Sequence, residues 1–316
     1  MALFAKNRKI AGRMVVHFQE DGICVAFMRR LSSGSAVVNR VIFYPHNKST
    51  AMLSLSKLAK DLHGAQYDCS NLLTTGEYQL LSVDAPNVPV EEMKTAMRWR
   101  LKDMLDYHID DATIDVLAVP GDKDAPVRNH SMYAVAARNQ LIEQRQAQFD
   151  EARIPLSVID IPEMAQRNLS AMLEPAGRGV ALLSFDASGG LLTVTFSGEL
   201  YLARRIDVTL QQIQQAESEQ KDACYDQITL ELQRSFDHFD RQYRFITLSK
   251  LVLSPLGEVG KGLQTYLAAN LYVPIEIMDL SSLFDISNVP DLKRLETQQR
   301  YFLALGAALR EEEIAL

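Results

Sequence analysis

The sequence predicts a mixed α/β protein built from two related halves. Strand meanders alternate with amphipathic helices along the 316 residues, which is the pattern of a mixed fold. A strand–turn–strand unit opens each half, at Met14–Met28 and again at Val180–Phe196. This recurrence indicates structural duplication, although the halves share too little identity to count as a sequence repeat. The length fits about two domains.

The segment from residue 179 to residue 206 is the most informative part of the chain. Three apolar, β-prone runs are separated by glycine-bearing turns, which predicts consecutive antiparallel hairpins. Asp186 closes the first run, and Ser188, Gly189 and Gly190 follow it. Glycines at such a junction let backbone N–H groups approach an anion, and the aspartate is placed to hold a metal ion or orient water. The alternative is an ordinary meander in which Asp186 only starts the turn.

Composition excludes several classes of protein. The apolar and charged fractions of 47% and 23% are those of an ordinary globular chain. The three cysteines are far apart and the six histidines are scattered, so neither a disulfide framework nor a zinc site is predicted, and a reducing cytoplasm is expected. A net charge of −7 argues against nucleic-acid binding. No segment reaches the ~20 apolar residues that a membrane span needs.

A helix is predicted from Glu91 to Tyr107. Pro89 precedes it and acidic residues occupy its first turn, as helix N-termini favour. One face, predicted to be buried, carries Met93, Met97, Leu101 and Met104. Trp99, the only tryptophan, points away from that face. It indicates either packing on another domain or a second contact surface.

The remaining helices and the chain's best domain boundary lie further on. Glu174–Gly179 contains a proline and two glycines and is the strongest candidate for a boundary between domains. A long amphipathic helix is predicted through Ile228 and Tyr243, followed by a strand and the glycine-bearing loop Ser254–Gly262. A nearly all-apolar last helix at Tyr301–Leu309 is predicted to be buried.

In this order the segments resemble the actin-like ATPase fold, a duplicated ribonuclease H-like α/β fold, as used by the pilus-assembly protein PilM and the cell-division protein FtsA. The resemblance covers roughly residues 10 to 310 through many weak matches. The segments that carry it are Pro86–Pro89 with the Arg98-Trp99-Arg100 helix, Ala134–Arg138, Asp186 with its turn, Ser197–Leu200, Arg204–Ile206, Leu253–Leu263 and Ala304–Leu309. Within the family, the likeness is to the PilM-type component of mannose-sensitive haemagglutinin (MSHA) pilus biogenesis.

The resemblance implies three structural units. Residues 1–75 and 131–176 form the first actin-like domain in two segments. Residues 76–130 form a small inserted α+β subdomain, and residues 177–316 form the second actin-like domain. If a nucleotide binds, the resemblance places Asp186 near magnesium, with the phosphate and adenosine contacts at Ser188, Gly189, Gly190 and Gly257.

Two departures from the family pattern argue against catalysis. Active members carry Asp-x-Gly, small hydroxylated residues and a lysine in the first hairpin, where this chain has Glu20-Asp21-Gly22 and no lysine. A carboxylate ~4 Å from a phosphate costs on the order of 4 kcal/mol at an effective dielectric near 20. Pro255-Leu256 stands where the adenosine loop has Gly-Gly, which removes a donor and adds bulk. We therefore expect no ATP hydrolysis, no catalytic residues and no resident metal or cofactor.

The resemblance implies a non-catalytic cytoplasmic scaffold in the inner-membrane assembly platform of a type IV pilus. It implies docking of the cytoplasmic N-terminal peptide of a PilN-like membrane protein, which holds the chain peripherally at the membrane. The assembly motor ATPase is a second expected partner, and nucleic acid is not one. The first alternative is a working PilM-like ATPase that binds ATP and magnesium and closes on nucleotide.

Other enzyme classes fit the sequence less well. A small-molecule kinase shares this architecture, but neither a substrate-side base nor an intact phosphate loop is identifiable. A serine hydrolase needs a nucleophile elbow, and a metal enzyme needs clustered ligands; the sequence contains neither.

Overall fold

The computed structural model describes residues 12–31, 34–45, 51–62, 67–121, 131–215 and 218–311. Of the ranges assigned from the sequence, residues 1–11, 32–33, 46–50, 63–66, 122–130, 216–217 and 312–316 lie outside this description. The first five-stranded sheet has the order β3-β2-β1-β4-β8. Its antiparallel meander is β1 (Arg13–Gln19), β2 (Gly22–Arg30) and β3 (Ala36–Pro45). Two strands parallel to β1 complete it, β4 (Asp68–Leu72) and β8 (Leu156–Asp160).

The second five-stranded sheet repeats that topology with the order β11-β10-β9-β12-β13. Its meander is β9 (Gly179–Asp186), β10 (Gly189–Phe196) and β11 (Glu199–Ile206), and its parallel strands are β12 (Leu248–Leu253) and β13 (Ile275–Ile277). The predicted duplication is therefore confirmed. β9 and β10 are buried along almost their whole length, which explains why their sequences are mostly apolar.

Helices cover the outer face of each large sheet. On the first sheet, α1 (Ala51–Asp61) and α3 (Asn139–Glu151) bury Leu55 and Phe149 against Val16. On the second, α6 (Ser218–Gln242) and α7 (Val259–Asn270) bury Phe236 and Leu263. The shorter helices of this half are α5 (Leu210–Gln215), α8 (Leu280–Leu283) and the 3-10 turn η2 (Pro290–Lys293).

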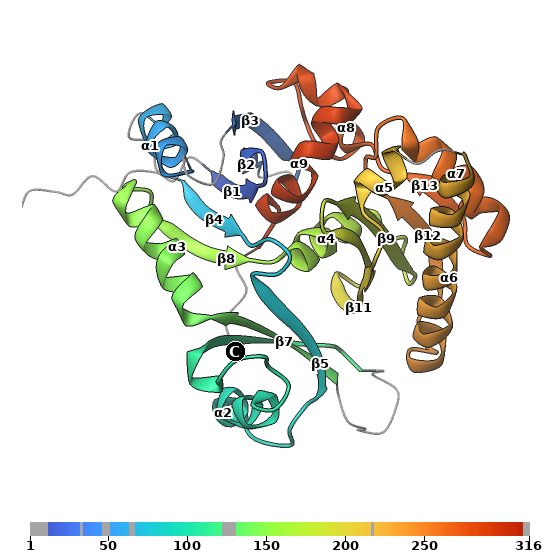
Figure 1. The fold of residues 1–316 in the computed structure, drawn as a ribbon, viewed down its shortest axis with the longest axis horizontal. Helices are drawn as coiled ribbons and strands as arrows, with labels where there is room; N and C mark the ends of the chain where they lie inside the picture. The colour runs from blue at the N-terminus through green and yellow to red at the C-terminus, as the bar shows by residue number, and fades with distance from the viewer. Residues whose placement is uncertain are drawn as a thin grey trace, which may run out of the picture.

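Two helices lie between the large sheets, and each crosses to the other half. α4 (Pro162–Ala171) follows a strand of the first sheet but packs on β9, β10 and β11. α9 (Leu295–Ala308) ends the second half but packs on β1, β2 and β4. Figure 1 shows both at the centre of the molecule. One apolar cluster accordingly joins Val15 of the first sheet, Leu182 of the second, and Ala165 and Leu305 of the two helices. The last helix is buried as predicted.

The two central helices touch closely at Gly306. A Cβ on this residue would lie 2.4 Å from the carbonyl oxygen of Ala165 and 2.9 Å from Cδ1 of Leu169. The side-chain amide of Asn168 donates to the carbonyl oxygen of Gly306 at 3.0 Å. The bare Cα of a glycine is what lets the backbones approach this far.

The inserted unit is a three-stranded sheet with a helix on one face. Its strands are β5 (Tyr78–Asp84), β6 (Ala112–Ala118) and β7 (Ser131–Arg138) in the order β5-β7-β6, and its helices are α2 (Val90–Leu101) and the 3-10 turn η1 (Ile109–Asp111). Residues 131–138 were assigned from the sequence to the first large domain. Their backbone instead pairs with β5 and β6, so by sheet topology the inserted unit extends to Arg138 rather than to residue 130.

The helix predicted to reach residue 107 ends at Leu101. Arg98 donates to the carbonyl oxygens of Ile109 at 3.0 Å and Ala112 at 3.3 Å, which fixes the returning chain beside the helix. Met104, expected on the buried face, is consequently 46% exposed. Trp99 is 71% exposed, so it does not pack on another domain, and the alternative of a contact surface remains.

We expect Gly306→Ala to lower the free energy of unfolding by about 1–3 kcal/mol, because the new methyl group overpacks a contact made by backbone atoms. Gly260→Ala in α7 is the matched control. A Cβ there meets only side-chain atoms at 3.5 Å and 3.6 Å, so the change should stay within roughly 1 kcal/mol. Urea unfolding of both variants measures the difference, and equal stability of the two would contradict the close helix crossing.

Candidate functional site

The turn of the first hairpin is tied to the central helix α9. The Asp21 carboxylate accepts a hydrogen bond from Nη1 of Arg300 at 2.9 Å. The Arg300 guanidinium also stacks on the ring of Phe43, 4.0 Å from its centroid. Glu20 and Asp21 are exposed. The positive charge of Arg300 therefore partly neutralises the two acids expected to repel phosphate, so the repulsion is smaller than two free carboxylates would give. The sequence did not reveal this contact.

The turn of the second hairpin uses Asp186 to cap itself. Its Oδ1 accepts the backbone N–H of Ser188 at 2.7 Å and that of Gly189 at 3.1 Å. This is an Asx-type turn, in which the side chain satisfies the donors that follow it. The structure thus brings these predicted site residues together, but the N–H groups expected to face a phosphate already have an acceptor.

Packing accounts for both glycines of that turn. Gly189 has φ +135°, and a Cβ there would lie 2.7 Å from the carbonyl oxygen of Ile206. A Cβ on Gly190 would lie 2.8 Å from the ring of Phe185 and 3.1 Å from Cβ of Ile206. Because neighbouring chain fills these spaces, the glycine pair is explained by the hairpin alone.

The loop after β12 carries the fifth predicted residue, Gly257. Because β12 runs parallel to β9, the loops that follow these two strands leave the same end of the sheet. The backbone N–H of Ser254 donates to the carbonyl oxygen of Leu183 at 2.8 Å. Gly257 takes the left-handed conformation with φ +59°. Leu256 before it is buried in the core of the second half. The side chain of Leu256, which was expected to add bulk to the adenosine loop, therefore points into the protein interior.

At the edge strand β11 of the second sheet lies a polar cluster that the sequence did not predict. Nη2 of Arg205 donates to Oε1 of Glu163 at 2.9 Å and to the hydroxyl of Tyr78 at 2.8 Å. The Tyr78 hydroxyl donates to Oε2 of Glu163. The side chain of Glu163 is only 3% exposed. Burial and the nearby charge of Glu163 raise the pKa of Tyr78 well above its ordinary value, so the phenol keeps its proton.

The cluster joins three parts of the fold. Tyr78 begins β5 of the inserted unit, Glu163 lies in the first turn of α4, and Arg205 lies near the end of β11. Only the position of Glu163 just after Pro162, at a helix start, is visible in the sequence. Nothing in the spacing of these residues indicates that they meet.

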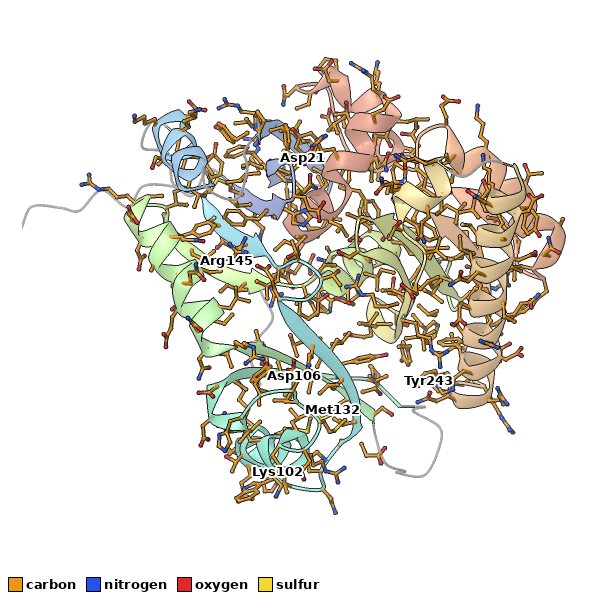
Figure 2. The ribbon with its side chains drawn as sticks, in the orientation of Figure 1. Asp21, Lys102, Asp106, Met132, Arg145 and Tyr243 are labelled. Atoms are coloured by element: carbon orange, nitrogen blue, oxygen red, sulfur yellow. The ribbon has the colours of Figure 1, made fainter. Side chains whose placement is uncertain are left out.

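A hollow of about 240 Å³ lies between the inserted unit and α3. Its wall includes Gln79, Asp106, Tyr107, Arg138 and Leu141. The guanidinium of Arg138 stacks 4.1 Å from the centroid of the Tyr107 ring, and Nε2 of Gln79 donates to Oδ1 of Asp106 at 3.1 Å. Figure 2 shows Asp106 far from Asp21, so the hollow is separate from the first hairpin turn.

Two buried polar atoms at the hollow lack a partner among the described residues. They are Oε1 of Gln79 and the hydroxyl of Tyr107. A buried polar atom without a hydrogen bond costs ~1–3 kcal/mol, so a ligand that pairs with it recovers that free energy. Burial raises the pKa of Tyr107, which keeps the phenol protonated and able to donate. Both atoms lie beneath the surface of the wall, so a polar ligand can pair with them only where its binding exposes them.

His17 is buried beside the first hairpin and is neutral at physiological pH. Burial lowers its pKa to about 4, Glu77 opposes the shift and Arg145 adds to it. Nε2 of Gln19 lies 3.5 Å from its Nδ1. These contacts make the histidine a structural residue.

Its lowered pKa makes the stability of the fold depend on pH. Between pH 6.5 and about 4 the unfolded chain binds the proton and the folded chain does not, so stability falls as pH falls through this range. From pH 7 to pH 5, the wild-type protein should lose about 2 kcal/mol more than His17→Gln. Urea titrations at both pH values measure this difference. Identical losses would show that His17 is not buried in its neutral form.

Within the described ranges, no group of three or more metal-ligating side chains is close enough to hold an ion. In the same part of the chain, no helix has both the length and the apolar character needed to cross a membrane.

Comparison with known proteins identifies the fold. No family model and no curated protein matches the sequence. A chain of a PilM-PilN type IV pilus biogenesis complex matches the structure with a TM-score of 0.70 and 17% identity, over 95% of this chain and 98% of that one. A Bacteroides thetaiotaomicron protein with an actin-like ATPase fold and unknown function gives 0.51 and 9%, over 90% and 96%. With its duplicated five-stranded sheets and exchanged central helices, this chain has the actin-like ATPase fold.

Proposed function

We propose that this protein is a scaffold of a type IV pilus assembly platform, and that it binds the cytoplasmic N-terminal peptide of a PilN-like inner-membrane protein. The match along nearly the full length of a chain from a PilM-PilN complex supports this assignment. The protein then works in the cytoplasm, held at the inner membrane by its partner. The assembly motor ATPase is a further proposed partner.

The observation that carries the proposal is the hollow between the inserted unit and α3. Extended peptides bind proteins by filling pockets and by pairing with exposed backbone and side-chain groups. Here Leu141 supplies an apolar part of the wall, and peptide binding would expose the unpaired acceptor of Gln79 and donor of Tyr107 that lie beneath the surface. A peptide backbone, which carries both N–H and C=O groups, matches that pair.

We assign the pilus to the MSHA type, with this protein in the role of MshI. The overall likeness of the sequence segments supports that choice. Genes for a pilin, a secretin and a PilN-like protein beside this gene would strengthen it, and a shared operon with sugar metabolism would reverse it.

We also propose that the nucleotide site is degenerate and that the protein does not hydrolyse ATP. The donors after Asp186 are bound within their own turn, and the first hairpin presents acids where a phosphate needs donors. Without ATP or magnesium as a cofactor, the fold serves as a rigid support for the peptide site.

The peptide site is tested by titration calorimetry with a synthetic peptide of the PilN-like protein's cytoplasmic N-terminus. We expect heat of binding with the wild-type protein. Asp106→Ala removes the acceptor that orients Gln79 and one side chain of the wall; because the site is then less well ordered for the peptide, binding should weaken about tenfold. Asp103→Ala, an exposed neighbour outside the hollow, should bind like the wild type. No heat with the wild-type protein would count heavily against the proposal.

The alternative function is an active PilM-like ATPase whose closure on nucleotide regulates partner binding. The turn at Asp186, Gly189 and Gly190 is the feature that favours it, because a ligand phosphate can compete with the Asp186 carboxylate for the same N–H groups.

Thermal unfolding with and without Mg-ATP separates the two functions. The scaffold should show no rise in Tm on addition of Mg-ATP, because no nucleotide binds its folded state. The ATPase should show a rise that Asp186→Ala abolishes. Because that variant also loses the turn cap, the informative quantity is the shift on adding Mg-ATP to each protein. A clear rise in the wild-type protein would overturn the degenerate site.

A further inference from the structure

Tyr78 takes part in two separate features of the molecule. It lines the hollow proposed to hold the partner peptide. Its hydroxyl also belongs to the polar cluster around the buried Glu163, donating to Glu163 and accepting from Arg205 at 2.8 Å. A single side chain of β5 therefore touches the ligand site on one side and the second large domain, through Arg205 of β11, on the other.

The buried carboxylate makes the three participants depend on one another. Removing one partner of a buried charge leaves it uncompensated, which is strongly unfavourable, and groups in one such network couple energetically. Glu163 has a tyrosine hydroxyl on one oxygen and a guanidinium on the other. A movement of β5 or of β11 away from α4 would break one of these bonds.

A second contact fixes the inserted unit to the same strand. The hydroxyl of Tyr133, on β7, donates to the carbonyl oxygen of Tyr201 at 3.2 Å and accepts from the backbone N–H of Ala203 at 3.1 Å. β11 is the edge strand of the second sheet, so these bonds satisfy part of its free edge. Two neighbouring strands of the inserted unit thus hold β11, and both also line the hollow, β7 through Ala136 and Arg138.

We propose that the Tyr78–Glu163–Arg205 cluster couples occupancy of the hollow to the position of the second large domain. This inference rests on the proposed peptide site. The intact cluster holds the Tyr78 ring where it forms the wall of the hollow, and so prepares the site for the peptide. By linkage, a bound peptide strengthens the attachment of β11 to the inserted unit by the same factor.

The first arm of the test needs no peptide. Glu163→Gln combined with Arg205→Met removes the ion pair without leaving a lone buried charge, and Tyr78→Phe removes only the hydroxyl. Amide hydrogen exchange on β5 and β11 should be faster in both variants than in the wild-type protein. Exchange unchanged on both strands would overturn the cluster as a link between the units. Should the double variant fail to unfold cooperatively, Tyr78→Phe alone decides this arm.

The second arm measures peptide binding by calorimetry. Neither Glu163 nor Arg205 lines the hollow, yet their double variant should bind the peptide about fivefold more weakly or worse, the usual lower range of allosteric coupling. Arg234→Met breaks an exposed pair with Glu231 on α6 and should bind within about twofold of the wild type. Wild-type affinity in the double variant would overturn the coupling.

The two arms also separate this inference from the proposed function. Saturating peptide should slow exchange on β11 in the wild-type protein but not in Tyr78→Phe, which retains an aromatic ring but lacks the hydroxyl that links it to Glu163 and Arg205. Binding without any change on β11 would overturn the coupling while leaving the peptide site in place. No binding to the wild-type protein would overturn the proposed function, and the peptide-free exchange would still show whether the cluster joins the units.

Discussion

The contact between α4 and α9 is the constraint on which the rest of the structure depends. Each helix leaves its own half and packs on the sheet of the other, so neither half has a complete core alone. The helices meet where Gly306 lets the backbone of Ala165 approach. Because this crossing fixes the two sheets relative to each other, it also fixes where their hairpin turns and loops lie.

A polar cluster around the buried Glu163 adds the inserted unit to that arrangement. Glu163 extends from the first turn of α4, and its carboxylate holds Tyr78 of the small sheet and Arg205 of the second domain. An isolated charge with this little exposure would be strongly unfavourable. Its two partners make it tolerable, and in doing so they determine how three structural units meet.

The hairpin turns show how similar residues can serve different purposes in one fold. An aspartate followed by glycines suits an anion site, but in this protein Asp186 accepts the two N–H groups itself and the glycines avoid neighbouring chain. Two residues that line the hollow beside α3, Gln79 and Tyr107, each carry a buried polar atom without a partner among the described residues.

The sequence by itself determined the mixed α/β class, the duplication, most helices and strands, and the turn that gathers Asp186 and Gly189, because each of these follows from local periodicity and turn chemistry. The sequence did not predict that α2 ends at Leu101 or that β7 pairs within the sheet of the inserted unit. Both depend on contacts that the chain makes after it turns back on itself. Only the tertiary structure decided the helix exchange, the Arg300 contact with the first hairpin, the buried cluster and the hollow. These are contacts between residues far apart in the chain, and no spacing or periodicity in a sequence encodes which distant side chains will meet.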